Sequence, residues 1–250
     1  MKRGFLFCYY AYFHRAAVTF AEGIESQNVV GYNTLDTGFA SQMLGVPFKG
    51  VGNNYDGVKL SDINGEFVSY DEIQISYMED GLINFNTYQF LTEEDGVEAA
   101  GWYDGSWEPA TDCIIPRGSA VWFVSSSGDA KGVTVAGEVT KGSTTHPAFE
   151  ESSNMICSAY PVAFNPNATT VTWAGLQPYD EIQVSYMEDG LINFNTYQYL
   201  TEEDGVEKNG WYNGSWELVE EPIASVGEGF WLIVSDYANV TLTEKSPIAE

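Results

Sequence analysis

Polar and apolar residues alternate at positions 72–77 (EIQISY), and the alternation resumes at positions 83–87 (INFNT). An apolar side chain at every second residue is typical of a half-buried strand. Between the two runs lies Asp80-Gly81, a dipeptide that favours tight hairpin turns. The pattern therefore predicts a β-hairpin.

This hairpin belongs to a segment that occurs twice in the chain. Residues 70–108 and 179–217 align without a gap at an offset of 109 positions. Such self-similarity indicates a repeated structural unit, so we expect each half of the chain to contain one complete unit. The copies differ at only five positions, which are Ile75/Val184, Phe90/Tyr199, Ala99/Lys208, Ala100/Asn209 and Asp104/Asn213.

The pattern outside the repeat also favours strands. Residues 120–124 (AVWFV) form an apolar run bounded by turn residues, which is typical of a central strand. No window has a sustained helical period, and 25 glycines supply frequent turns. We therefore predict an all-β chain of two tandem, similar domains, each a β-sandwich or β-barrel. The expected domains are residues 24–147 and 148–250, joined by the polar residues 140–147.

The amino end has the features of an export signal. Two of the first three residues are basic, residues 4–13 are apolar, and small residues precede Ala21. This order predicts a signal peptide at residues 1–21, and hence a secreted, extracellular or cell-surface protein. The alternative is a buried N-terminal strand or helix. The apolar run is too short to cross a bilayer, so no membrane span is expected.

The cysteines leave two states open. Cys8 would be removed with the signal peptide, which leaves Cys113 and Cys157. These two residues either pair in an oxidising compartment or remain as buried free thiols in apolar strands.

The charge of the chain excludes two classes of partner. Ten Lys and Arg against 36 Asp and Glu give a formal net charge of −26. A charge of this sign repels phosphate, so neither nucleic acid nor an anionic membrane is an expected partner. Because 44% of the residues are hydrophobic, the chain can still bury a core.

Residues for nucleophilic or zinc-dependent catalysis are lacking. After signal removal His146 is the only histidine, and it lies in the expected joint between the domains. Ser-His-Asp and Cys-His chemistry needs a positioned imidazole, and zinc sites draw on clustered Cys and His. We therefore expect no enzyme activity and no catalytic residues. A carboxylate-dependent glycoside hydrolase is a third-ranked alternative, because two carboxylates suffice for that reaction.

An acidic turn in each copy is the candidate metal site. Each turn combines three carboxylates with a following glycine, and Ca²⁺ prefers about six to eight oxygen ligands of this kind. The loop does not match an EF-hand, so the alternative is an exposed turn that holds no ion. The residues are Glu93, Glu94 and Asp95 in the first copy and Glu202, Glu203 and Asp204 in the second.

Aromatic residues around the repeated Gly-Trp-Tyr element are the candidate ligand site. Flat aromatic faces beside polar groups bind sugar rings and also anchor protein interfaces. The alternative is that these rings fill the core of a small β domain. The residues are Trp102, Tyr103 and Trp107, with Trp211, Tyr212 and Trp216 in the second copy.

A strand ahead of the first repeat has two ways to pair. Residues 24–34 are strand-like, with Ile24, Val29, Val30 and Tyr32 at apolar positions. The strand either completes a sheet in its own chain or adds to the open edge of a neighbouring molecule. The second mode would produce a polymer, so self-association is an expected interaction beside glycan binding.

Residues 21–32 (AEGIESQNVVGY) resemble the start of a group of uncharacterised secreted bacterial proteins. Members of that group have duplicated β units with a Gly-Trp-Tyr-Asp-Gly element, which is similar to Gly101–Gly105 here. The resemblance implies export and a two-unit β architecture, and it implies no activity.

These features lead to one interpretation and one main alternative. The first is a non-catalytic extracellular protein that serves as a surface, matrix or filament-forming structural subunit. The alternative is a pair of carbohydrate-binding or adhesion modules that use the repeated Trp and Tyr residues.

Overall fold

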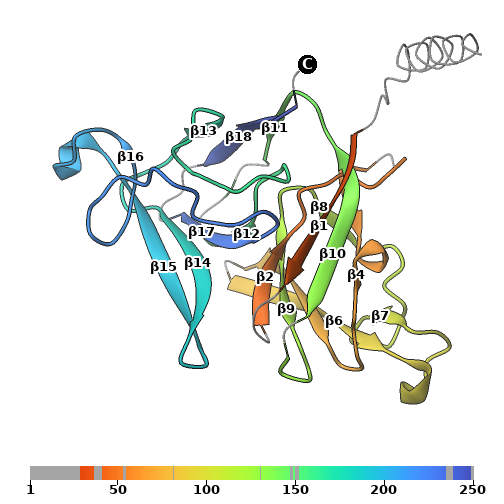
Figure 1. Cartoon of the computed structure of the whole chain (residues 1–250). Helices are drawn as coiled ribbons and strands as arrows, with labels where there is room; N and C mark the ends of the chain where they lie inside the picture. Colours follow the sequence, from red (N-terminus) through yellow and green to blue (C-terminus); the bar gives the residue numbers. More distant parts are fainter. Residues whose placement is uncertain are drawn as a thin grey trace, which may run out of the picture.

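The computed structural model describes residues 29–36, 41–52, 55–80, 82–129, 131–146, 149, 152–234 and 239–248 (Figure 1). This part of the chain is all-β, which confirms the predicted class, and its helical segments are short 3₁₀ turns at Leu60–Asp62, Glu93–Asp95 and Glu202–Asp204. The signal peptide expected at residues 1–21 lies outside it. None of the helices described is long and apolar enough to cross a membrane.

Strands β1 to β10 form what we call the first half, and strands β11 to β18 form the second half. The first half contains β1 (Val29–Asp36), β2 (Ser41–Gly45), β3 (Gly57–Lys59), β4 (Asn64–Gly65), β5 (Glu72–Glu79), β6 (Leu82–Leu91), β7 (Gly101–Tyr103), β8 (Ile114–Pro116), β9 (Ala120–Val124) and β10 (Gly132–Val139). The second half contains β11 (Ser143–Thr145), β12 (Ser152–Ile156), β13 (Val171–Ala174), β14 (Glu181–Glu188), β15 (Leu191–Leu200), β16 (Gly210–Tyr212), β17 (Phe230–Val234) and β18 (Thr241–Lys245).

The two halves have the same sheet order. The five-stranded sheets are β2-β9-β5-β6-β7 and β12-β17-β14-β15-β16, and the three-stranded sheets are β1-β10-β4 and β11-β18-β13. Strands β3 and β8 form an additional two-stranded sheet in the first half. Because β11 pairs with β18, residues 143–145 of the expected joint lie in a sheet of the second half.

The predicted hairpin is present in both copies. Strand β5 pairs with β6 from Glu72↔Gln89 to Glu79↔Leu82, and β14 pairs with β15 in the same register. Asp80 has a left-handed φ of 52°, as expected for the first central residue of an Asp-Gly hairpin turn. The alternation has its expected effect, because Ile73 is fully buried while the neighbouring Glu72 is not.

Each half has its own hydrophobic core. Apolar residues from the inner face of each five-stranded sheet pack mainly with other residues of the same half, and their burial drives folding. The first core also takes in Ala159 and Tyr160 from the second half. Large, completely buried members are Phe48, Leu60, Ile73 and Phe123 in the first core and Ile182, Trp211, Phe230 and Leu232 in the second.

Strand register shows which positions of the halves are equivalent. Val121 and Phe230 are 109 positions apart, the offset of the sequence repeat, and they pair with Leu44 and Ile156 respectively. Leu44 is therefore equivalent to Ile156, and its neighbour Gly45 is equivalent to Cys157.

The halves contact one another reciprocally. Leu44 forms a β-bridge with Glu228, and its equivalent Ile156 forms a β-bridge with Ser119, which is the equivalent of Glu228. Contacts in which residue i meets residue j of the partner, and residue j meets residue i, define a two-fold interface. The chain therefore folds as a pseudo-dimer of its own two halves.

Backbone hydrogen bonds repeat this symmetry. The Gly45 amide donates to the Gly227 carbonyl at 2.8 Å, and the Cys157 amide donates to the Gly118 carbonyl at 2.8 Å. Gly227 and Gly118 are again 109 positions apart, and both have left-handed φ angles. The same turn in each half thus receives the edge strand of the other half.

A small hydrophobic cluster lies at the centre of the contact. Met43, Ala120 and Met155 are buried there, and Trp122 and Trp231 pack against them. Met43 is equivalent to Met155, and Trp122 to Trp231, so the cluster is close to symmetric about the pseudo-two-fold axis.

A buried carboxylate joins three segments of the second half, including His146 just after β11. Glu244 Oε1 accepts a hydrogen bond from the Ala159 amide at 2.8 Å and pairs with His146 Nε2 at 2.7 Å. Glu244 Oε2 accepts the Ser158 hydroxyl at 2.6 Å. A buried charge is tolerated when its oxygens are satisfied in this way.

We expect Glu244→Ala to lower the free energy of unfolding by about 3 kcal/mol, because three buried donors lose their acceptor. Urea denaturation of the full chain measures this loss. The control is Glu203→Ala, an exposed carboxylate that should change stability by less than about 0.5 kcal/mol. A loss no larger than that of the control would contradict the assignment.

Candidate functional site

A tight loop after β7 presents Trp107, and the same loop after β16 presents Trp216. Asp104 Oδ1 accepts hydrogen bonds from the amides of Ser106 at 2.8 Å and Glu108 at 3.0 Å, and the Trp107 amide donates to the Asp104 carbonyl at 3.0 Å. In the second copy Asn213 makes the corresponding bonds. Either side chain supplies the acceptor oxygen, so the exchange of Asp for Asn leaves the loop unchanged.

Both tryptophans are exposed and have unfavourable backbone angles. Trp107 and Trp216 are 52% and 57% exposed, with φ angles of 65° and 64°. A left-handed φ is a genuine outlier for a bulky residue, and such strain concentrates at functional sites. Only about half of the surface of each tryptophan is buried to offset the strain. The loops therefore present an indole ring at a cost in stability, twice in one chain.

An open hollow of about 470 Å³ adjoins Trp216. Tyr212 and Leu218 form part of its wall, and the polar groups on it come from Glu207, Lys208 and Glu220. Its volume is in the range of ligand sites, and an aromatic face with a few polar groups at its border is their usual composition. This arrangement can stack a sugar ring on the indole while carboxylate and ammonium groups bond to its hydroxyls.

The other four predicted ligand aromatics are core residues. Trp102, Tyr103, Trp211 and Tyr212 are at most 6% exposed, so their rings belong to the core alternative, although Tyr212 also lines the hollow beside Trp216. Trp102 packs edge-on against Phe67 and Phe90, and Trp211 packs against Trp173 and Tyr199. The Tyr103 and Tyr212 hydroxyls donate to the carbonyls of Ala99 and Lys208, in the segments that lead into β7 and β16.

The acidic turn is a capped 3₁₀ turn. Asp95 Oδ2 accepts hydrogen bonds from the Ser69 hydroxyl and from the amide and hydroxyl of Thr92, and Asp204 bonds to Thr201 in the same way. These bonds hold the pKa of Asp95 below its ordinary value, the one from Ser69 having the largest effect. Of the carboxylates expected to bind Ca²⁺, Asp95 and Asp204 thus serve as local caps. The described residues contain no group of three or more His, Cys, Asp or Glu arranged to hold a metal.

The expected assembly strand pairs within its own chain. Residues 29–36 form β1, which pairs with β10 from Val29↔Val139 to Asp36↔Gly132. Val30 and Tyr32 are exposed on this edge strand, and Ile24 lies outside the described residues. The pairing favours the intramolecular alternative over strand donation to a neighbour.

Both described cysteines are free thiols in the structure. Burial raises the pKa of the Cys157 thiol, and it also raises that of Cys113. Of the two alternatives drawn from the sequence, the structure contains the unpaired state.

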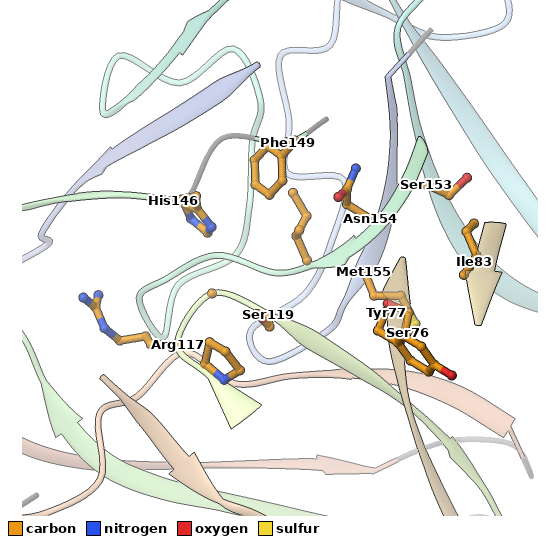
Figure 2. Close-up of a pocket in the computed structure, with 13 residues that line it drawn as sticks. Ser76, Tyr77, Ile83, Arg117, Ser119, His146, Phe149, Ser153, Asn154 and Met155 are labelled. Carbon is orange, nitrogen blue, oxygen red and sulfur yellow. The ribbon is translucent and has the colours of Figure 1, made fainter. Parts of the chain in front are cut away.

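A second cavity, of about 320 Å³, lies between the two halves (Figure 2). In the view shown, Arg117 and His146 lie on its left side and Tyr77 and Ile83 on its right, with Phe149 above. The first half contributes residues from β5, β6 and the turn before β9, and the second half contributes residues from β12 and its approach. Two polar side chains on its wall have partners: Arg117 pairs with Asp56, and His146 Nε2 pairs with Glu244.

The placement of His146 corrects the expectation that it lies in a polar joint. The residue is 4% exposed, and its ring lies against Gly118, where a Cβ would be within 2.8 Å of Nδ1. Arg117 also bridges the halves, because its Nη1 donates to Thr144 and to the Ala159 carbonyl. Sequence reasoning missed both positions because nothing local distinguishes a polar residue that bridges two units from one in a solvated connection.

Comparison with known proteins adds no functional assignment: no family model matches the chain, and neither a curated protein nor a solved structure shows significant similarity to it.

The capping carboxylates predict an acid-dependent loss of stability. Hydrogen bonds lower the pKa of Asp95 and Asp204 from the ordinary 3.8, so their contribution is present above that pH and is lost as pH falls through the lower folded value. We expect Asp95→Asn/Asp204→Asn to flatten the decline in the urea midpoint below about pH 4. The matched control is Glu94→Gln/Glu203→Gln on the same turns. Equal acid sensitivity in both double variants would exclude this role.

Backbone strain predicts an unusual substitution series at Trp216. Glycine adopts a left-handed φ without penalty, whereas alanine does not, so Trp216→Gly should be about 1 kcal/mol more stable than Trp216→Ala. Thermal and urea unfolding of the two variants measure the difference. The reverse order would show that the loop does not need a left-handed residue in solution.

Proposed function

We propose that the chain is an exported, non-catalytic binding protein with two carbohydrate sites, one at Trp107 and one at Trp216. The observation that carries the proposal is the pair of exposed tryptophans held at left-handed φ in two copies of one loop. Each tryptophan is more than half exposed, and an aromatic platform in solvent suits the face of a sugar ring.

The surroundings of Trp216 support a hydroxyl-rich ligand. Glu207 and Glu220 supply acceptors for sugar hydroxyls at the hollow, and Lys208 supplies a donor. The strong negative charge of the chain disfavours phosphate-rich or sulfate-rich polymers. A neutral glycan is therefore the ligand class that fits best.

Duplication supports binding rather than catalysis. Two tandem, similar β domains, the architecture that we propose for residues 24–147 and 148–250, place two similar sites on one chain. Two sites that engage one polysaccharide raise the overall affinity without new contacts. This gain suits a protein that adheres to a repetitive surface. Within the structural-subunit interpretation, polymerisation by strand donation needs β1 to be free, whereas β1 is paired in its own chain.

A glycan array probed with the full chain tests the proposal. We expect binding to one or more neutral glycans and its loss in Trp107→Ala/Trp216→Ala. Each single variant should lose about tenfold or more in apparent affinity on a dense surface, because bivalency is removed. The control is Leu82→Ala/Leu191→Ala, which removes two apolar side chains that are each 68% exposed at the hairpin turns.

Two results would contradict the proposal. Binding that survives the double Trp variant would place the site elsewhere, and absence of binding to every glycan would remove the ligand class. Release of free sugar from a bound glycan is measured in the same samples. Turnover that depends on Glu207 or Glu220 would reassign the hollow to glycoside hydrolysis.

A further inference from the structure

The contact between the halves contains two positions where only one side chain fits. A Cβ built on Gly229 would overlap the Ala120 Cβ, and one built on Gly45 would lie 2.5 Å from the Cys157 Cβ, closer than real Cβ contacts. Ala120 and Gly229 are equivalent positions, as are Gly45 and Cys157. Each pair therefore meets across the pseudo-two-fold axis, with a side chain on one half and none on the other.

These pairs determine which halves can associate. Two first halves would bring Ala120 against a second Ala120, in a space that admits one Cβ. Two second halves would bring Cys157 against a second Cys157, with their Cβ atoms too close even for a disulfide. A first half with a second half is the one combination in which both positions fit. The steric clash is a device against wrong pairing.

Nothing in this contact requires that the two halves belong to one molecule. The connection from β10 to β11 is residues 140–142, and it contains Gly142 at a left-handed φ of 80°. Exchange of identical elements between chains is a low-cost route to dimers, and short hinge segments favour it.

We propose that the surface between the halves also binds a second copy of this chain, by exchange of halves, and that Gly45 and Gly229 restrict this exchange to first-with-second pairing. In the exchanged dimer the first half of each chain packs on the second half of the other. All reciprocal contacts, including Leu44–Glu228 and Ile156–Ser119, are kept. The intramolecular arrangement predominates in dilute solution, because the tether gives it a high effective concentration.

The proposal is tested with a variant in which the small and large residues trade places. Ala120→Gly/Gly229→Ala keeps one Cβ at the axis, and flexible Met43 has to adjust around its new position. The variant should fold and dimerise with itself. In a mixed dimer, the wild-type first half would meet the variant second half, and two methyl groups would occupy the space for one. The variant first half would meet the wild-type second half, and that space would be empty.

The experiment mixes ¹⁵N-labelled wild-type chain with unlabelled variant, unfolds both in urea, refolds them together at low and high concentration, and counts dimers by native mass spectrometry. A mixture of labelled and unlabelled wild type sets the statistical level, in which half of all dimers are mixed. We expect dimers at high concentration, and wild-type/variant mixed dimers at least about tenfold below that level.

Two outcomes overturn the proposal. One is the absence of dimers in the wild-type mixture at every concentration. The other is mixed dimers at the statistical level, which would place dimerisation on another surface. If Ala120→Gly/Gly229→Ala does not fold, Gly45→Ala/Cys157→Gly applies the same logic at the other position. The result is independent of glycan binding, because neither Trp107 nor Trp216 takes part in the contact.

Discussion

The architecture depends on how closely two β-sheets approach at the pseudo-two-fold axis. The approach requires a residue without a side chain opposite Ala120 and another opposite Cys157, and Gly229 and Gly45 meet that requirement. Protein interiors are packed so tightly that one extra methyl group lowers stability. Two glycines therefore set the relative position of the halves. The cavity of Figure 2, which both halves line, takes its place from this approach.

Local features of the fold could be predicted from the sequence, because strand period and turn chemistry act over a few residues. The hairpin at Asp80-Gly81 and the all-β class follow from alternation and turn dipeptides, and the repeat at residues 70–108 and 179–217 is visible by eye. The contact between the halves could not be predicted. It is made by residues far apart in the sequence, such as Leu44 with Glu228, and no local pattern encodes their proximity.

The aromatic cluster shows the same limit at the scale of a site. Trp102 and Trp107 are five residues apart in one motif, yet the first is core and the second is exposed. Alternation with a period of two assigns a side chain to one face of a sheet only within a strand. Trp107 lies beyond the end of β7, where the conformation of the loop determines the direction of the side chain. The acidic turn was similarly ambiguous, because a cap and a cation ligand use the same carboxylates. His146 was misplaced for a third reason: its partner Glu244 is 98 positions away.

The two copies have diverged unevenly around their tryptophans. Two of the five differences, Ile75/Val184 and Phe90/Tyr199, keep the apolar or aromatic character of residues at the core. The other three surround the Trp loops and make the second copy less acidic by two charges: Ala99/Lys208, Ala100/Asn209 and Asp104/Asn213. The scaffold of each site is thus the same, while its electrostatic surroundings differ.

The left-handed φ angles of the two tryptophans also affect the outcome of single-base mutations. Tryptophan has a single codon, TGG, and one base change converts it to GGG, which encodes glycine. At Trp107 and Trp216 that change would relieve backbone strain instead of creating it. At each of the two positions, a single base change would thus give a loop with less backbone strain. The proposed stacking on a sugar ring gives both positions a reason to keep tryptophan despite the strain.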